Sequence, residues 1–147
     1  MSLENYEQLK LEKQLCFPLY AAAKEVVRKY KPYLDEIDLT YTQYITMMVL
    51  WDKEQCNVKE LGSMLYLDSG TLTPLLKKPE SKGYITRCRC KEDERNLIIR
   101  ITDKGEALKE KAASIPHEMA SKWVNLEKEE ITNMYHSLYK LLSQVQE

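Results

Sequence analysis

This 147-residue chain has few glycines, few histidines and no long uncharged run, and each scarcity excludes a class of protein. The longest stretch without a charged residue runs from Leu39 to Trp51, 13 residues, whereas a membrane-spanning helix needs about 20. Four glycines provide no glycine-rich phosphate loop, and two isolated histidines provide no zinc-hydrolase motif. We therefore expect no transmembrane helix and none of the common phosphate-loop or zinc enzymes.

The amino terminus also lacks the apolar block and cleavage site of a secretory signal, so we expect a cytoplasmic protein with no membrane partner. In that reducing compartment the four cysteines are expected to be thiols, because their spacing (Cys16, Cys56, Cys88, Cys90) does not resemble a disulfide framework. Cys88 and Cys90 would share one face of a strand, but two ligands without a nearby histidine are a weak metal signal. No metal and no cofactor are expected.

Charge is distributed unevenly along the chain, although 22 basic and 23 acidic residues give a net charge of only −1. Between Lys77 and Arg100 there are eight basic and four acidic residues, a local charge of +4, which leaves 14 basic and 19 acidic residues, or −5, elsewhere. A basic segment in an acidic chain is typical of a surface that binds a polyanion, because the contacting face displaces counterions from the phosphates. A chance excess of charge on a solvated face is the alternative.

Apolar residues at helical spacing predict that most of the chain is α-helical. One amphipathic helix covers residues 15–30, and Pro32 is expected to end it. The capping boxes Thr40-x-x-Gln43 and Asn57-x-x-Glu60 predict the start of two more helices. Three helices are therefore expected before residue 66.

A fourth helix is expected after a tight turn at Tyr66 and Leu67. Asp68 or Ser69 can cap its start, and Gly83 ends it. Its inward face is apolar, with Leu72, Leu75 and Leu76. Its outward face is small, polar and basic, with Gly70, Thr71, Thr73, Pro74, Lys77 and Lys78.

After Gly83 the apolar period changes from about 3.6 to 2 residues, which predicts two strands, 84–89 and 97–101, joined by the charged loop 91–96. A further helix is expected from Thr102 to Leu126, and a last one from residue 131 to 145. Two short helices joined by a tight turn and followed by a basic hairpin are the order of a winged helix-turn-helix. In that fold one helix enters the major groove of DNA, and the basic loop follows the backbone or the minor groove.

Several separated motifs resemble the MarR family of bacterial transcription regulators. They are residues 65–78 (LYLDSGTLTPLLKK), Glu92-Asp-Glu-Arg95 in the wing and Ile101-Thr-Asp-Lys-Gly105. Residues 15–22 (LCFPLYAA), 30–32 (YKP) and 39–44 (LTYTQY) resemble its organic hydroperoxide resistance (OhrR) subgroup. The resemblance covers nearly the whole chain. It implies a mainly α fold with a small β-hairpin in one domain, with a helical dimerisation region (1–35 and 103–147) and a winged helix-turn-helix lobe (40–102).

The resemblance also implies a homodimer that binds a pseudo-palindromic operator in double-stranded DNA. Apolar stripes on the three helices outside the lobe independently favour a partner chain, and a monomeric helical bundle is the alternative. DNA contacts are expected on the fourth helix and the wing, from Ser69, Thr71, Thr73, Lys77, Lys78, Arg87, Arg89, Asp93 and Arg95.

Cys16 matches the peroxide-sensing thiol of the subgroup. Tyr30 and Tyr41 match tyrosines that hydrogen-bond this thiol from the other subunit, and Tyr20 matches a third tyrosine of the pocket. A phenol that donates to sulfur stabilises the thiolate, the form that organic hydroperoxide oxidises to sulfenic acid. Because the C-terminal helices contain no second cysteine, a low-molecular-weight thiol or further oxidation is expected to follow. Without the resemblance, the alternative is that Cys16 and the tyrosines are ordinary core residues with no sensing role.

The sequence thus predicts a transcription regulator rather than an enzyme, a repressor that leaves its operator when Cys16 is oxidised. One alternative is a MarR-type regulator controlled by a phenolic ligand in the inter-helix cleft, with Cys16 structural. Another is a thiol peroxidase, which the missing resolving cysteine and basic group disfavour. Pro79 departs from the family pattern. A proline there removes the hydrogen bond to the Leu75 carbonyl and can kink the fourth helix, which leaves its C-terminal half open.

Overall fold

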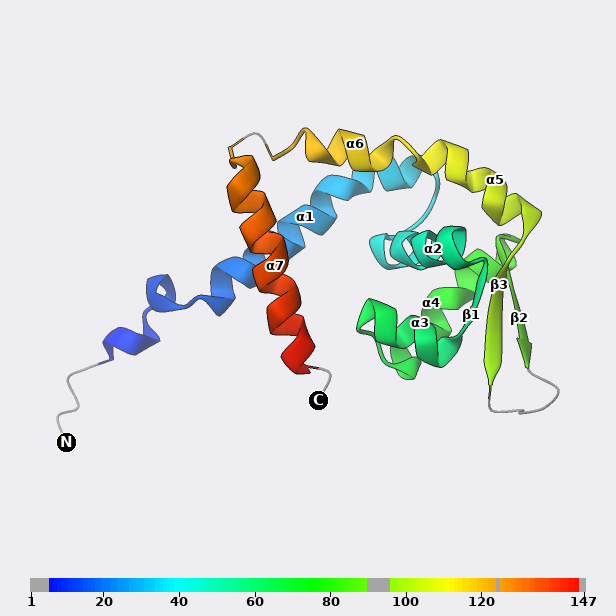
Figure 1. Cartoon of the computed structure of the whole chain (residues 1–147), viewed down its shortest axis with the longest axis horizontal. Coiled ribbons are helices and arrows are strands. Elements are labelled where there is room, and N and C mark those ends of the chain that lie inside the picture. Colours follow the sequence, from blue (N-terminus) through cyan, green and yellow to red (C-terminus); the bar gives the residue numbers. More distant parts are fainter. Residues whose placement is uncertain (1–5, 90–95, 124, 146–147) are drawn as a thin grey trace. The chain divides into compact units, whose positions relative to one another are not determined.

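The computed structural model describes residues 6–89, 96–123 and 125–145. The chain divides into two compact units, Met1–Tyr41 and Thr42–Glu147, which are described separately. Helices dominate both units, and the second also contains a small antiparallel sheet (Figure 1). The predicted fold class is therefore confirmed. Within the described ranges, no helix is both long and apolar enough to cross a bilayer.

The first unit contains two short 3-10 turns, Glu7–Leu9 and Leu11–Lys13, followed by the long helix α1 (Cys16–Glu36). The prediction that Pro32 ends this helix is wrong, because α1 continues for one more turn. A proline removes only one backbone donor, and its fixed φ fits the helical conformation. The added turn carries Leu34, whose side chain is buried, so packing favours continuing the helix.

The second unit has its core among α2 (Tyr41–Lys53), α3 (Val58–Leu65), α4 (Ser69–Ser81) and the sheet. Helix α2 begins directly after Thr40, as the capping box predicts. Each element contributes side chains that are almost fully buried: Met47, Leu50, Leu61, Leu72, Leu76, Ile85 and Ile99. Of the inward face predicted for α4, Leu72 and Leu76 therefore pack into the core, while Leu75 is half-buried.

The sheet has three antiparallel strands in the order β1-β3-β2, formed by β1 (Gln55–Asn57), β2 (Ile85–Arg89) and β3 (Leu97–Ile101). The hairpin of β2 and β3 confirms the two predicted strands, whose register places Ile85 opposite Ile101. Strand β1 was not predicted, since three residues show no apolar period. Its pairing places the buried Cys56 opposite Ile99 in the central strand.

The prediction of one helix from Thr102 to Leu126 is also wrong. Helix α5 (Asp103–Ala112) ends after ten residues, and a separate helix, α6 (Ile115–Ala120), follows it. Pro116 lies at the second position of α6, where it has no N–H to donate to the Ala112 carbonyl and favours a break. The predicted cap is confirmed, because Thr102 Oγ1 accepts from the Gly105 N–H at 3.1 Å. The last helix, α7, covers Lys128–Val145.

Candidate nucleic-acid interface and thiol site

Two side-chain caps position α3 and α4 around a tight turn. Asn57 Oδ1 accepts from the Glu60 N–H at 2.7 Å, which is the predicted cap, and the reciprocal bond to Glu60 Oε1 comes from Asn57 Nδ2 at 3.0 Å. At α4 the cap is Asp68 rather than Ser69, because its carboxylate accepts from the Thr71 N–H at 2.7 Å. That hydrogen bond lowers the pKa of Asp68, which therefore stays ionised at neutral pH.

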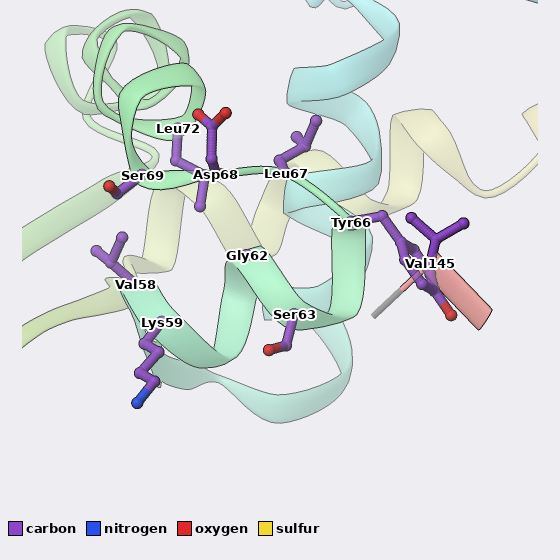
Figure 2. A pocket seen from close by; sticks show the side chains of 10 residues that line it. All are labelled: Val58, Lys59, Gly62, Ser63, Tyr66, Leu67, Asp68, Ser69, Leu72 and Val145. Carbon is purple, nitrogen blue, oxygen red and sulfur yellow. The ribbon is translucent and has the colours of Figure 1, made fainter. Parts of the chain in front are cut away.

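The turn between α3 and α4 leaves no room for a side chain at Gly62. A Cβ there would lie 2.6 Å from the Leu67 carbonyl oxygen and 3.1 Å from Leu72 Cδ1. Tyr66 ends α3 in the left-handed conformation, with φ of 56°, and the Leu67 N–H donates to the Gly62 carbonyl at 3.0 Å. Beside this turn lies an open cavity of about 740 Å³, with Ser69 in its lining (Figure 2).

The outward side of α4 carries the residues predicted to contact DNA. Ser69, Thr73 and Lys77 are exposed and follow one another at intervals of four residues, so they form one stripe along the helix. Thr71 is also exposed, and Lys78 is half-buried. Hydroxyl and ammonium groups on such a stripe can reach phosphates and base edges in a major groove.

The prolines of α4 do not end the helix. Both Pro74 and Pro79 lie inside it, and it continues to Ser81. Pro79 is buried, and its carbonyl accepts from the Tyr84 N–H at 2.9 Å. The sequence did not decide the conformation of the C-terminal half of α4, because of Pro79. The structure shows that this half is helical. Gly83 follows in the left-handed conformation, with φ of 78°, as predicted for a residue that ends a helix.

The wing strand β2 holds Arg87 in an ion pair that the sequence analysis missed. Arg87 Nε donates to Glu80 Oε2 at 2.7 Å, and Nη2 donates to Oε1 at 2.9 Å. The hydrogen bond from Arg87 lowers the pKa of Glu80, and Glu80 in turn raises the pKa of Arg87. Arg89 is exposed on the same strand, and the predicted contacts Asp93 and Arg95 lie outside the described residues.

A second group of contacts that the sequence analysis missed attaches α5 to the lobe formed by α2, α3, α4 and the sheet. Trp51 Nε1 donates to the Gly105 carbonyl at 2.9 Å, and the Thr102 N–H donates to the Tyr84 carbonyl at 3.0 Å. Gly105 lies so close to the Tyr84 carbonyl that a Cβ would overlap it. The first turn of α5 is therefore held against both α2 and the turn before β2.

The predicted thiol site is only partly assembled within one chain. Tyr30 and Tyr41 are in contact, with ring centroids 4.9 Å apart and ring planes tilted by 50°, and burial raises the pKa of Tyr30. Cys16 is exposed at the first position of α1, and Tyr20 lies one turn after it. Cys16 and Tyr30 are 14 positions apart on one helix, which separates them by about 21 Å along its axis. The structure therefore brings the two tyrosines together and leaves the cysteine away from them.

Large apolar side chains are exposed on both terminal helices. Helix α1 exposes Phe17, Leu19 and Val27 and has one buried residue, Leu34. Helix α7 has no buried residue among those described, and it exposes several apolar side chains: Ile131, Met134, Tyr135, Leu138, Tyr139, Leu141 and Val145. A monomer rarely leaves so much apolar surface in contact with water.

Of the remaining cysteines, the structure describes Cys56 and Cys88. Cys56 is buried, and burial raises the pKa of its thiol, which disfavours the reactive thiolate. Cys88 is exposed on β2, and Cys90 lies outside the described residues. In the part of the chain that the structure describes, no three His, Cys, Asp or Glu side chains are grouped as metal ligands would be.

Comparison with known proteins identifies similar transcription regulators. The family described as transcriptional regulator SarA/Rot matches residues 28–112. The organic hydroperoxide resistance transcriptional regulator of Bacillus subtilis is 52% identical over 115 residues, 78% of each chain. The HTH-type transcriptional regulator SarZ of Staphylococcus aureus is 45% identical over 133 residues, covering 90% of this chain and 89% of SarZ.

Solved structures of AbfR are similar along nearly the whole chain. Reduced AbfR bound to DNA has a TM-score of 0.78 at 32% identity and covers 96% of this chain and 98% of AbfR. AbfR has also been solved in an overoxidized form bound to DNA and in a disulfide form. The chain thus resembles a regulator whose structure is known in several oxidation states.

Proposed function

The chain belongs to the MarR family of transcription regulators, together with the organic hydroperoxide resistance and SarA-type proteins. We propose that it is a homodimeric repressor that leaves its operator when organic hydroperoxide oxidises Cys16. It is a DNA-binding transcription regulator by family. The repression, the signal and the residues that carry them are the proposal. We place the dimerisation region in residues 1–35 and 103–147 and the DNA-binding lobe in residues 40–102.

The outward stripe of α4 is the observation that carries the DNA-binding assignment. Leucines on the inward side fix the helix to the core, so Ser69, Thr73 and Lys77 are presented on a rigid element rather than on a loop. The similar protein AbfR was solved on DNA in its reduced form. We assign base-edge or phosphate contacts to this stripe with Thr71 and Lys78, and minor-groove contact to Arg95.

A second copy of the chain is the partner that the exposed apolar faces of α1 and α7 require. A twofold dimer would present two recognition helices to a pseudo-palindromic site, about one helical turn apart. The thiol site supports the same conclusion. Since Cys16 and Tyr30 lie about 21 Å apart along one helix, the hydrogen bond between them that the family resemblance implies needs the tyrosine of another subunit.

Oxidation of Cys16 would then change the packing of the interface between the two subunits. Hydroperoxide oxidises the thiolate to a sulfenic acid and is reduced to an alcohol, and a low-molecular-weight thiol condenses with the sulfenic acid to a mixed disulfide and water. Overoxidized AbfR was itself solved on DNA, so we assign release to the bulkier mixed disulfide. A close-packed interface does not absorb that volume without moving its helices.

A small-ligand regulator is the second candidate, because a mainly apolar cavity of about 270 Å³ lies between α2 and the α5–α6 junction. Tyr44, Met48 and Trp51 line it from α2. An aromatic cavity of this kind suits a phenolic compound. In that case Cys16 would be structural, and DNA release would not depend on peroxide.

A titration of DNA binding tests the proposal. The probe is a fluorescent duplex selected from a random library by the reduced protein, and its anisotropy reports binding. We expect about one equivalent of cumene hydroperoxide per subunit, with free cysteine present, to release the duplex, and dithiothreitol to restore binding. A near-complete change of population requires the oxidised form to disfavour DNA by about 5.5 kcal/mol. Release by salicylate but not by hydroperoxide would instead establish the ligand-controlled regulator.

A further inference from the structure

The ion pair of Glu80 and Arg87 joins the end of α4 to the middle of β2. Both carboxylate oxygens accept from the guanidinium, at 2.7 and 2.9 Å, so the contact is bidentate. The side chains are also partly shielded, with 22% of Arg87 and 36% of Glu80 exposed. A bidentate pair fixes the relative orientation of its partners as well as their distance.

Two other ion pairs among the described residues are of a different kind. Lys31–Asp35 and Lys109–Glu106 each join neighbouring turns of one helix, and their side chains are 45% or more exposed. Exposed pairs within a helix contribute little to structure. The Glu80–Arg87 pair instead connects two elements, so its loss affects how they are held together.

The pair spans the two parts of the proposed DNA surface. Lys77 lies on α4 three residues before Glu80, and Arg89 lies on β2 two residues after Arg87. The connection between α4 and β2 begins at the turn around Gly83, where the Gly83 N–H donates to the Glu80 carbonyl at 2.9 Å. Because β2 is hydrogen-bonded to β3, the ion pair at Arg87 also restrains these two strands relative to α4.

The same pair makes Arg87 a poor phosphate ligand. Its guanidinium already donates two hydrogen bonds to Glu80, whose negative charge offsets its own. The hydrogen bond from Arg87 lowers the pKa of Glu80, so the carboxylate is ionised at neutral pH. A DNA phosphate would have to compete with a carboxylate that is already in place.

We propose that Glu80 and Arg87 are positioning residues that fix the wing relative to the recognition helix, and that the pair supports selectivity for the operator rather than attraction to phosphate. This inference depends on the proposed DNA-binding function. A wing held at one angle lets the α4 contacts and the wing contacts form together on the correct sequence. A loose wing still binds phosphates, but it discriminates less between sequences.

A double-mutant cycle tests the proposal on the full chain. The variants are Glu80→Gln, Arg87→Gln and their combination, with Glu106→Gln as a matched control that removes an ion pair within α5. Affinity is measured over a salt series for the duplex selected by the wild-type protein and for a scrambled duplex of the same length. Thermal melts followed by circular dichroism show that each variant is folded.

Positioning predicts that both single variants lower the ratio of selected to scrambled affinity by about fivefold, and that the double variant is no worse than either. Their salt slopes and the properties of Glu106→Gln should match the wild type. A phosphate-binding Arg87 predicts a different result: a slope reduced by about two units per dimer on both duplexes, also in the Glu80→Gln background. That result, or an unchanged ratio in folded variants, overturns the inference. A wild-type protein that selects no duplex overturns the proposed function instead.

Discussion

A disulfide between Cys16 and a cysteine introduced at position 30 tests whether two subunits build the thiol site. Disulfide-bonded residues have Cα atoms less than about 7 Å apart, whereas positions 16 and 30 lie about 21 Å apart on α1. Tyr30→Cys therefore cannot form this bond within one chain. If Cys16 faces Tyr30 of a partner subunit, mild oxidation will produce a covalent dimer, seen as a band of doubled mass on a non-reducing gel.

Two controls make the result specific. Arg28→Cys places a thiol on nearly the opposite side of α1, about 160° around the helix, where no bond to Cys16 is expected. All variants carry Cys88→Ser and Cys90→Ser, so that these two thiols cannot react in place of Cys16. A Cys16→Ser version must lose the cross-link. Equal cross-linking of Arg28→Cys, or none in Tyr30→Cys although sedimentation shows a dimer, would refute the two-subunit site.

Three further predictions concern the switch, the wing and the dimer. Cys16→Ser should bind the selected duplex like the wild type but stay bound after hydroperoxide is added, because an alcohol is nearly isosteric with the thiol and is not readily oxidised; release at the same dose would show that the sensor lies elsewhere. Arg95→Ala should weaken binding to selected and scrambled duplexes alike and lower the salt slope by about one unit for each phosphate that the wing no longer neutralises; an unchanged slope counts against the assignment of Arg95 to the DNA surface. Ile131→Asp with Leu138→Asp should place unpaired charge in the dimer interface at a cost of several kcal/mol each, and sedimentation should show a monomer; a stable wild-type monomer would contradict the model.

Local signals in the sequence predicted the elements that depend on local hydrogen bonds. Asn57 accepts the expected capping hydrogen bond from the Glu60 N–H, and Gly83 takes the positive φ that ends α4. The wrong or missing predictions concern segments whose structure depends on tertiary packing or on pairing with a distant strand. Pro32 does not end α1, since the following turn is continued by the buried Leu34. Strand β1 has only three residues, too few for a periodic signal, and its pairing partner in β3 lies more than 40 residues later.

The candidate site, like the fold, was predictable where it depends on local sequence and not where it depends on tertiary contacts. The outward face of α4 follows from helical spacing, and the structure places Ser69, Thr71, Thr73 and Lys77 on its exposed side. The family, inferred from separated motifs, is confirmed by the similar proteins. The contact between the rings of Tyr30 and Tyr41 could not be predicted from spacing, because these residues belong to different helices whose approach depends on the loop between them. Roles that involve a second subunit or DNA stay predictions.

Arg87 shows why a count of charges does not identify the residues that bind phosphate. The segment from Lys77 to Arg100 has a net charge of +4 whether or not Glu80 and Arg87 are paired, so the electrostatic attraction of the segment as a whole is unchanged. The pair instead affects Arg87 alone, because its guanidinium would have to break its hydrogen bonds to Glu80 before it could bind a phosphate. Position in the sequence could suggest the pair, since a helix end and a strand separated by a glycine turn place these two opposite charges side by side. Only the geometry, with two hydrogen bonds of 2.7 and 2.9 Å to Glu80, supports the proposal that Arg87 holds the wing in place rather than binding phosphate.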